Sequence, residues 1–259
     1  MLTSQSRRAA MTPPVQVNGQ TESLTITARG GGETLPFRYY PASKTHVVNI
    51  LQGTTYPALR GVDSVKVVVD IGANVGAASV FLALTYPEAT VHAIEPAPQA
   101  LSLLEENTRL IRRIHVHRHG LHEHAGVMRL YRSQWDPMSG SILASGENTD
   151  AFDELPFRSV AGWFGEHAVG TIDILKIDTE GCELPLLRAL GEQAATARVI
   201  YLEYHSEQDR RSIDRLLSES HILAAITSRH PHRGDACYVH RDSELAKASE
   251  TLAIRSEGN

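Results

Sequence analysis

A strand, a glycine-containing loop and a helix follow one another without a break at residues 66–85. Residues 66–71 form a β-branched run (Lys-Val-Val-Val-Asp-Ile) that is typical of a strand buried on both faces of a parallel sheet. Gly72-Ala-Asn-Val-Gly76 comes next, and the helical stretch Ala77–Thr85 stops before Pro87. Glycines at such a junction allow a ligand to approach backbone amides. The unit therefore predicts a βαβ fold with a binding loop.

The same alternation continues through most of the chain. We predict further strands at Thr90–Glu95, Ile114–His119, Thr171–Asp178, Arg198–His205, Ile222–Thr227 and Ala236–Arg241, with helices at Pro96–Leu110, Glu183–Gln193 and Glu207–Ser218. Strands that alternate with helices imply right-handed βαβ units and a doubly wound, mostly parallel Rossmann-like sheet of the α/β class. Ligands of such sheets bind beyond the carboxyl ends of the strands.

The segments before and after this domain differ in composition. We expect residues 1–22 to be a mobile tail, 23–62 an N-terminal hairpin or lid extension, 63–242 the main domain and 243–259 a polar tail. Alternation of apolar and polar residues within Leu24–Tyr40, around glycines 30–32, predicts a β-hairpin. A short helix or loop is expected at Val47–Tyr56. We expect a cytoplasmic protein, because the sequence shows no apolar export segment and because its two cysteines, Cys182 and Cys237, are too few for a disulfide framework.

The segment between His122 and Gly170 interrupts the alternation. It contains a predicted strand at Val127–Arg132, then a Ser-Gly-Ser loop ending at Ile142, then the apolar pair Trp163-Phe164. A long insertion at the ligand edge suits a lid or a substrate wall. A packed structural insertion is the alternative, and the sequence leaves both open.

The acids at the predicted strand ends indicate which ligand the loop binds. A carboxylate at Glu95, which ends the second strand, can accept hydrogen bonds from both hydroxyls of a ribose. Asn74 stands where dinucleotide-binding loops need a glycine beside the pyrophosphate. An acidic rim at the strand ends repels a diphosphate and suits a cation. Its members are Asp70, Glu95, Asp178, Glu180 and Glu203. The predicted cofactor is S-adenosylmethionine (SAM), a sulfonium compound without a phosphate. The alternative is that the glycine loop is a turn made only for packing.

Several motifs resemble the FkbM family of SAM-dependent methyltransferases, a class I family. They are the loop Asp70–Gly76, Glu95-Pro96, Asn107, the run Leu175-Lys-Ile-Asp-Thr-Glu-Gly-Cys-Glu183, and Leu202-Glu-Tyr-His205. The resemblance implies a seven-stranded sheet with a reversed last strand and a monomethyl transfer, usually to a hydroxyl. It implies bacterial secondary metabolism, antibiotic biosynthesis included, or glycan tailoring. Cys182 departs from the family's small apolar residue, and we expect it to pack as a small hydrophobe.

The cofactor residues expected from these motifs lie in the loop and at the next two strand ends: Asp70, Gly72, Asn74, Gly76, Glu95, Pro96 and Leu121. Gly120-Leu-His122 offers no clear acidic contact for the adenine. Substrate-binding residues are predicted at Tyr56, Ser141 and Glu180.

Methyl transfer to a hydroxyl needs positioning and a base. Asp178, at the end of a strand, is one candidate; its structural alternative is an N-cap of the following helix. Glu203 and His205 share one side of their strand, so a carboxylate-held histidine is the second candidate base. A merely satisfied histidine is the alternative there. Glu183, in the first helical turn, is expected to be structural.

Charge and histidine content limit the partners. Thirty acidic and twenty-five basic residues leave a net charge of −5, which argues against nonspecific nucleic-acid binding, and no apolar run suits a membrane helix. A small-molecule hydroxyl acceptor is expected, and a homodimer is left open.

A divalent metal is not expected, although Asp178, Glu180 and Glu203 could supply ligands. The five histidines between His115 and His124 are expected to be structural or solvated.

Three functions thus remain to be compared. O-methylation of a small molecule, a secondary metabolite or a sugar moiety, is the main prediction. N-methylation of a small molecule or peptide is the alternative, followed by a SAM-binding protein without catalysis.

Overall fold

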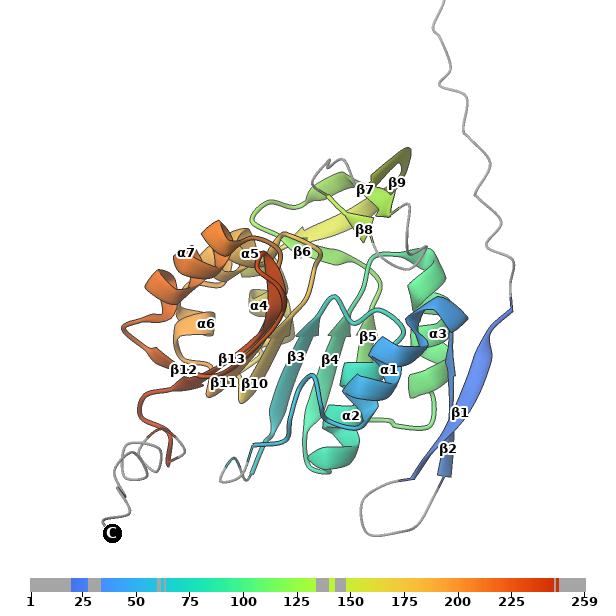
Figure 1. Cartoon of the computed structure of the whole chain (residues 1–259), viewed down its shortest axis with the longest axis horizontal. Helices are drawn as coiled ribbons and strands as arrows, with labels where there is room; N and C mark the ends of the chain where they lie inside the picture. The colour runs from blue at the N-terminus through green and yellow to red at the C-terminus, as the bar shows by residue number, and fades with distance from the viewer. Residues whose placement is uncertain are drawn as a thin grey trace, which may run out of the picture.

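The buried β-branched runs form a seven-stranded central sheet in the computed structural model (Figure 1). The structure describes residues 20–27, 34–59, 62, 64–133, 140–142, 148–244 and 246. The sheet comprises β3 (Val67–Ile71), β4 (Thr90–Ile94), β5 (Ile114–His117), β10 (Ile174–Ile177), β11 (Val199–Tyr204), β12 (His221–His230) and β13 (Arg233–His240).

The strand order is β12-β13-β11-β10-β3-β4-β5, and β13 runs in the direction opposite to the other six strands of this sheet. This confirms the doubly wound, mostly parallel sheet with a reversed last strand. The chain winds outward from β3 through β4 to β5, and then outward on the other side from β10. The switch point therefore lies between β3 and β10, where such folds bind ligands.

Helices cover both faces of the sheet (Figure 1). They are α2 (Ala77–Thr85), α3 (Pro98–Thr108), α4 (Val160–His167), α5 (Glu183–Leu190), α6 (Glu192–Ala195) and α7 (Glu207–Leu217). Successive residues of β3 enter opposite cores, because side chains alternate along a strand: Val68 packs with α2 and α3, and Val69 with α4 and α5. The predicted helix at 183–193 divides at Gly191, which lies at φ 51°.

The N-terminal extension is the expected antiparallel hairpin followed by a helix. It contains β1 (Glu22–Thr27), β2 (Thr34–Tyr39), a 3-10 turn η1 (Pro41–Ser43) and α1 (Lys44–Leu51). Asn107 of α3 fastens β2 to the glycine loop, since its amide accepts from Arg38 N at 2.7 Å and donates to Val75 O at 2.8 Å. The predicted tails fall mainly outside the described residues, as does the glycine turn at 30–32.

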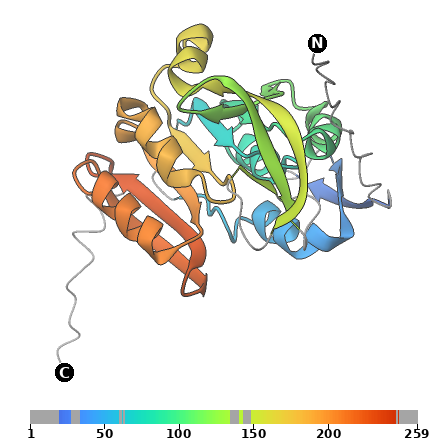
Figure 2. The same cartoon turned by 90° about the horizontal axis from the view of Figure 1, so that it is seen from above.

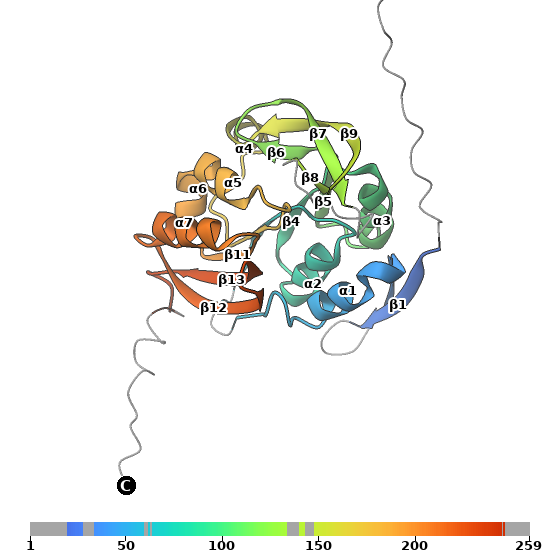
Figure 3. The same cartoon turned by 45° about the horizontal axis from the view of Figure 1, so that its top comes forward.

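The insertion forms a second sheet in the order β6-β9-β7-β8. Its strands are β6 (Gly120–His122), β7 (Gly126–Ser133), β8 (Gly140–Ser141) and β9 (Asn148–Ser159). Figures 2 and 3 show this green and yellow layer over the carboxyl end of the central sheet. The strand predicted at 127–132 is confirmed as β7. The strand β9 was not predicted, because Pro156 interrupts its strand pattern. Among the described helices, none is long and apolar enough to span a membrane.

Candidate functional site

A cavity of about 400 Å³ opens at the carboxyl ends of the central strands. Residues from the sequence prediction that line it are Gly72, Asn74, Glu95, Pro96, Leu121, Asp178, Glu180 and Glu203. The second sheet adds Leu130, Gly140, Ile142 and Phe157, so part of the insertion does form a wall of the cavity. Five polar lining residues were not predicted from the sequence, and they come from segments near the two ends of the chain: Ser43, His46, Arg229, His230 and Arg233.

Glu95 joins the glycine loop to the end of β4. One carboxylate oxygen accepts from Asn74 N at 2.9 Å and the other from Ala97 N at 2.8 Å. Burial raises the pKa of Glu95 to about 7, although these two bonds favour the charged form. A carboxylate has about four acceptor positions, so Glu95 keeps capacity for hydroxyl donors from the cavity. This geometry fits a ribose.

The glycines of the loop serve the packing of the protein itself. A side chain at Gly72 (φ 79°) would place its Cβ 1.9 Å from the carbonyl oxygen of Asp178, and one at Gly76 (φ 89°) would meet Leu104. Gly72 therefore lets the β3 and β10 ends approach each other at the switch point. Asn74 lies in the left-handed region at φ 50°, which asparagine tolerates. The loop shape is thus determined by the protein before any ligand binds.

Asp70 lies beneath the cavity and does not line it. Its buried carboxylate accepts from Ser79 Oγ at 2.6 Å and lies 3.1 Å from Lys176 Nζ. Lys176 is also buried and donates to Gly72 O at 2.6 Å. Burial alone would lower the pKa of Lys176, but Asp70 and Asp178 raise it, so the lysine stays charged. The structure gives Asp70 a place under the loop, and a direct cofactor contact stays a prediction.

Asp178 is held from below by Tyr56. The Tyr56 hydroxyl donates to Asp178 Oδ2 at 3.1 Å, and the tyrosine ring is buried outside the cavity lining. Burial would raise the pKa of Asp178, yet Lys176 lowers it well below its usual value. The alternative that Asp178 caps a helix is wrong, because Cys182 occupies the N-cap of α5. Tyr56 thus orients an acid where we predicted a substrate contact.

Ser141 is also buried, in β8, and only its neighbours Gly140 and Ile142 line the cavity. The remaining predicted substrate residue, Glu180, does line it. Gly76, a predicted cofactor residue, lies at the N-cap of α2 and not in the lining.

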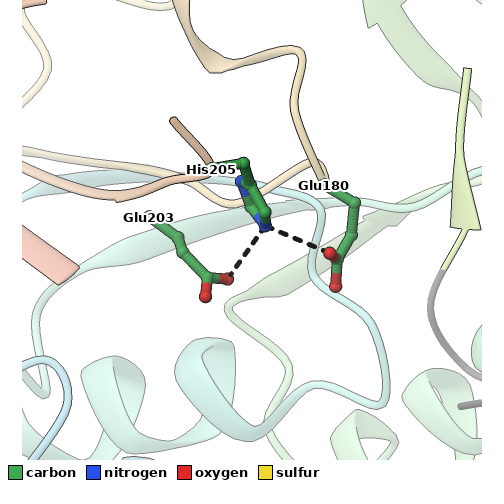
Figure 4. A group of neighbouring side chains, drawn as sticks. All are labelled: Glu180, Glu203 and His205. Atoms are coloured by element: carbon green, nitrogen blue, oxygen red, sulfur yellow. Dashed lines mark hydrogen bonds and ion pairs between the residues drawn. The ribbon is translucent and has the colours of Figure 1, made fainter. Parts of the chain in front are cut away.

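His205 lies among three carboxylates (Figure 4). Its Nε2 is 3.1 Å from Glu180 and 3.7 Å from Glu203, and its Nδ1 is 3.4 Å from Glu183. Burial would lower the pKa of His205, but the hydrogen bond to Glu180 and the nearby carboxylate of Glu183 raise it to about 10. Arg233 Nη2 also lies 2.9 Å from Nε2; we assign a proton to Nε2 because two carboxylates face it.

Glu183 closes the loop before α5, accepting from Thr179 N at 2.8 Å and Gly181 N at 3.1 Å. This confirms its expected structural role.

Burial and neighbouring Asp178 raise the pKa of Glu203 to about 8.

The same cluster is the place to test for a metal. Within the part of the chain that is described, ligand atoms of Glu180, Glu203 and His205 lie within 4.8 Å of one another. Arg233 already supplies positive charge there, because its Nε donates to Glu203 at 3.0 Å and its Nη2 to Glu180 at 2.7 Å. A cation would have to displace this guanidinium, so the donor set does not fit a resident metal in this arrangement.

The histidine-rich strand lies at the sheet edge, as expected. His117 of β5 contacts His92 of β4, with 3.1 Å between ring nitrogens, and both rings lie edge-on to Trp163. Burial lowers the pKa of His92 to about 4 and that of His117 to about 3. His115 and His124 are exposed. These histidines lie outside the cavity lining.

Comparison with known proteins agrees with this geometry. The family model described as "Methyltransferase FkbM domain" matches residues 70–225. The 2-O-methyltransferase NoeI of Sinorhizobium fredii is 27% identical over 158 residues, which cover 55% of this chain and 64% of NoeI. The hexuronic acid methyltransferase AglP of Haloferax volcanii is 25% identical over 162 residues, covering 61% of this chain and 64% of AglP. The chain thus matches less than two thirds of each relative.

A crystal structure of the methyltransferase FkbM from Methylobacillus flagellatus superimposes with a TM-score of 0.52 at 19% identity, over 73% of this chain and 48% of that one. This likeness shows a shared fold. The family model covers more than half of the chain and includes both the glycine loop and the Lys176–Glu183 run. The chain therefore belongs to the FkbM family of methyltransferases, with the class I fold.

Proposed function

We propose that this protein transfers one methyl group from SAM to a hydroxyl of a sugar-like small molecule. The observation that carries the proposal is Glu95, a carboxylate that holds the glycine loop by two backbone bonds and still faces the cavity. The names of two relatives support an oxygen acceptor on a sugar, since one is a 2-O-methyltransferase and the other acts on a hexuronic acid.

The cavity residues divide between the parts of the cofactor. Glu95 would accept from the ribose, Leu121 and Pro96 would face the adenine, and the loop from Gly72 to Asn74 would lie along the methionine part. SAM supplies an electrophilic methyl on a sulfonium. Acidic groups at the cavity floor, Asp178 among them, favour that positive charge over a diphosphate.

His205 and His46 differ in their charge, and this suggests which of these two histidines removes the proton. His205 is held as an imidazolium by its carboxylates and has no free lone pair. His46 of α1 lines the cavity within electrostatic range of Asp178, and burial lowers its pKa below the ordinary value. A neutral imidazole can accept a proton. We therefore assign the base to His46, and an electrostatic, positioning role to Asp178, Glu203 and His205.

The experiment is a screen of acceptors with isotopically labelled SAM. Free sugars, hexuronic acids, polyketide alcohols, amines and peptides are incubated with the protein, and mass spectrometry follows methylated product and S-adenosylhomocysteine. A labelled methyl ether formed together with S-adenosylhomocysteine supports the proposal, whereas a methylated amine supports N-methylation. Tight SAM binding by calorimetry without any product across the panel would favour the non-catalytic alternative.

A further inference from the structure

A basic turn lies at the mouth of the cavity. It joins β12 to β13 with the sequence Arg229-His-Pro-His-Arg233, which has two arginines, two histidines and no acid. Arg229, His230 and Arg233 line the cavity. The family match ends at residue 225, so this turn belongs to the part of the chain outside that match.

Buried acids fix the inner edge of both guanidinium groups. Glu203 is 4% exposed, and its Oε1 accepts from Arg233 Nε at 3.0 Å and also from Arg229 Nη2. Arg229 Nη2 donates to Asp235 as well, at 3.2 Å. Because a protonated carboxyl keeps a carbonyl oxygen, Glu203 can accept these bonds in either charge state. The two arginines are thus oriented before any substrate arrives.

The Nη1 group of each guanidinium is left for a ligand. The Arg229 and Arg233 side chains stay 43% and 41% exposed. Neither Nη1 has a hydrogen-bond partner within residues 20–246 as far as these are described. An arginine carries five donors in a planar fork that matches the two oxygens of a carboxylate or phosphate. Holding the fork in place reduces the entropy lost when such a bond forms.

The cavity is therefore divided by charge. Glu95 and Asp178, which suit a cationic cofactor, are its more buried part, whereas the arginine pair, which lines it together with Glu180 and Glu203, is its more exposed part. The Nη1 groups take no part in the pairs with Glu180, Glu203 and Asp235, and on a neutral polyol they would find no charged acceptor. An acceptor with an anionic group would satisfy them and would point its hydroxyl toward the floor.

We propose that the methyl acceptor carries an oxyanion, a carboxylate or a phosphate, bound by Arg229 and Arg233 at the cavity mouth. This inference rests on the proposed function for the acceptor's hydroxyl, but it concerns a separate part of the molecule. The basic turn then selects acidic sugars over neutral ones before methyl transfer.

The test is calorimetric binding to the full chain saturated with S-adenosylhomocysteine, with glucuronate, glucose 6-phosphate and glucose as probes. We expect one or both anionic probes to bind at least tenfold more tightly than glucose, and the stronger of the two identifies the oxyanion. Arg229→Gln and Arg233→Gln should each weaken that probe at least tenfold. Arg233→Lys, which keeps the charge, should recover part of the affinity.

Arg241→Gln is the matched control, because Arg241 donates to Ser218 O away from the cavity lining. Equal affinity for glucose and both anions would overturn the proposal, and so would an equal loss in the Arg241 variant. Affinity for S-adenosylhomocysteine is measured in every variant. Intact cofactor binding with no preference for anions refutes this inference alone, whereas lost cofactor binding in the wild type refutes the proposed function.

Discussion

Replacing Glu95 by glutamine tests the cofactor site most directly. Both carboxylate oxygens of Glu95 accept backbone N–H groups, from Asn74 and Ala97. In Glu95→Gln the amide NH₂ must face one of these donors, so one bond is lost and a buried N–H is left unpaired, at about 1–3 kcal/mol. The bonds to the ribose also become neutral, roughly half as strong as charge-assisted ones. We expect the Kd for SAM to rise about 10- to 100-fold, at 1.4 kcal/mol per factor of ten.

The pH dependence of binding gives the sharper signature. Burial raises the pKa of Glu95 to about 7 in the free protein, so the group is largely protonated below pH 7. Ribose hydroxyls donate to the carboxylate and favour its charged form, so binding lowers this pKa and releases a proton. Calorimetry should therefore show affinity falling by up to about tenfold per pH unit below 7 and levelling above it.

The variant and a surface control separate Glu95 from other titrating groups. Glu95→Gln should lack the part of the pH dependence that Glu95 causes, while Glu88→Gln, at an exposed glutamate paired with Lys66, should bind SAM as the wild type does. The role assigned to Glu95 is refuted if wild type and Glu95→Gln show the same pH slope, or if the variant binds SAM with unchanged affinity.

Three further substitutions test the groups around the cavity. Lys176→Met leaves Asp70 buried without its counter-charge and should cost about 3–5 kcal/mol in the free energy of unfolding, measured by urea denaturation; a loss below about 1 kcal/mol would contradict the ion pair. His46→Gln should slow turnover at least about tenfold with SAM affinity unchanged, as followed by mass spectrometry; wild-type turnover would remove it as the base. His205→Gln should destabilise the fold at neutral pH. The pKa of His205 is raised to about 10 in the folded protein, so its charge contributes stability. This contribution is fully present below about pH 6.5 and is lost as the pH rises toward 10. The difference from wild type should shrink over that range in thermal unfolding, and a constant difference would count against the charged state.

Local sequence pattern determined the elements that carry the cofactor loop. The β-branched run of β3, the glycines at 72 and 76, and Glu95 at the end of β4 lie within one βαβ unit, where chain connectivity alone brings them together. Such units are short-range, so periodicity and turn residues predict them. The same reasoning placed β5 at the sheet edge and Asp178 and Glu203 at the cavity.

Tertiary structure decided which of the acids face the ligand. A strand end marks the edge of the sheet but not the depth of each side chain, so Asp70, which belongs to the same predicted set as Glu95, turned out to lie beneath the loop against Lys176. Tyr56 was likewise predicted at the substrate and instead supports Asp178 from a buried position.

The parts of the site contributed by the two ends of the chain were decided by long-range packing. His46 reaches the cavity because α1 follows a hairpin that Asn107 fastens to the glycine loop. Arg229 and Arg233 reach it because β13 inserts antiparallel beside β11, which brings the turn of that hairpin next to Glu203. By itself the sequence determined a cofactor loop and the class of fold. Only packing between distant segments decided which side chains surround the methyl acceptor, because no local periodicity records contacts between the ends of the chain.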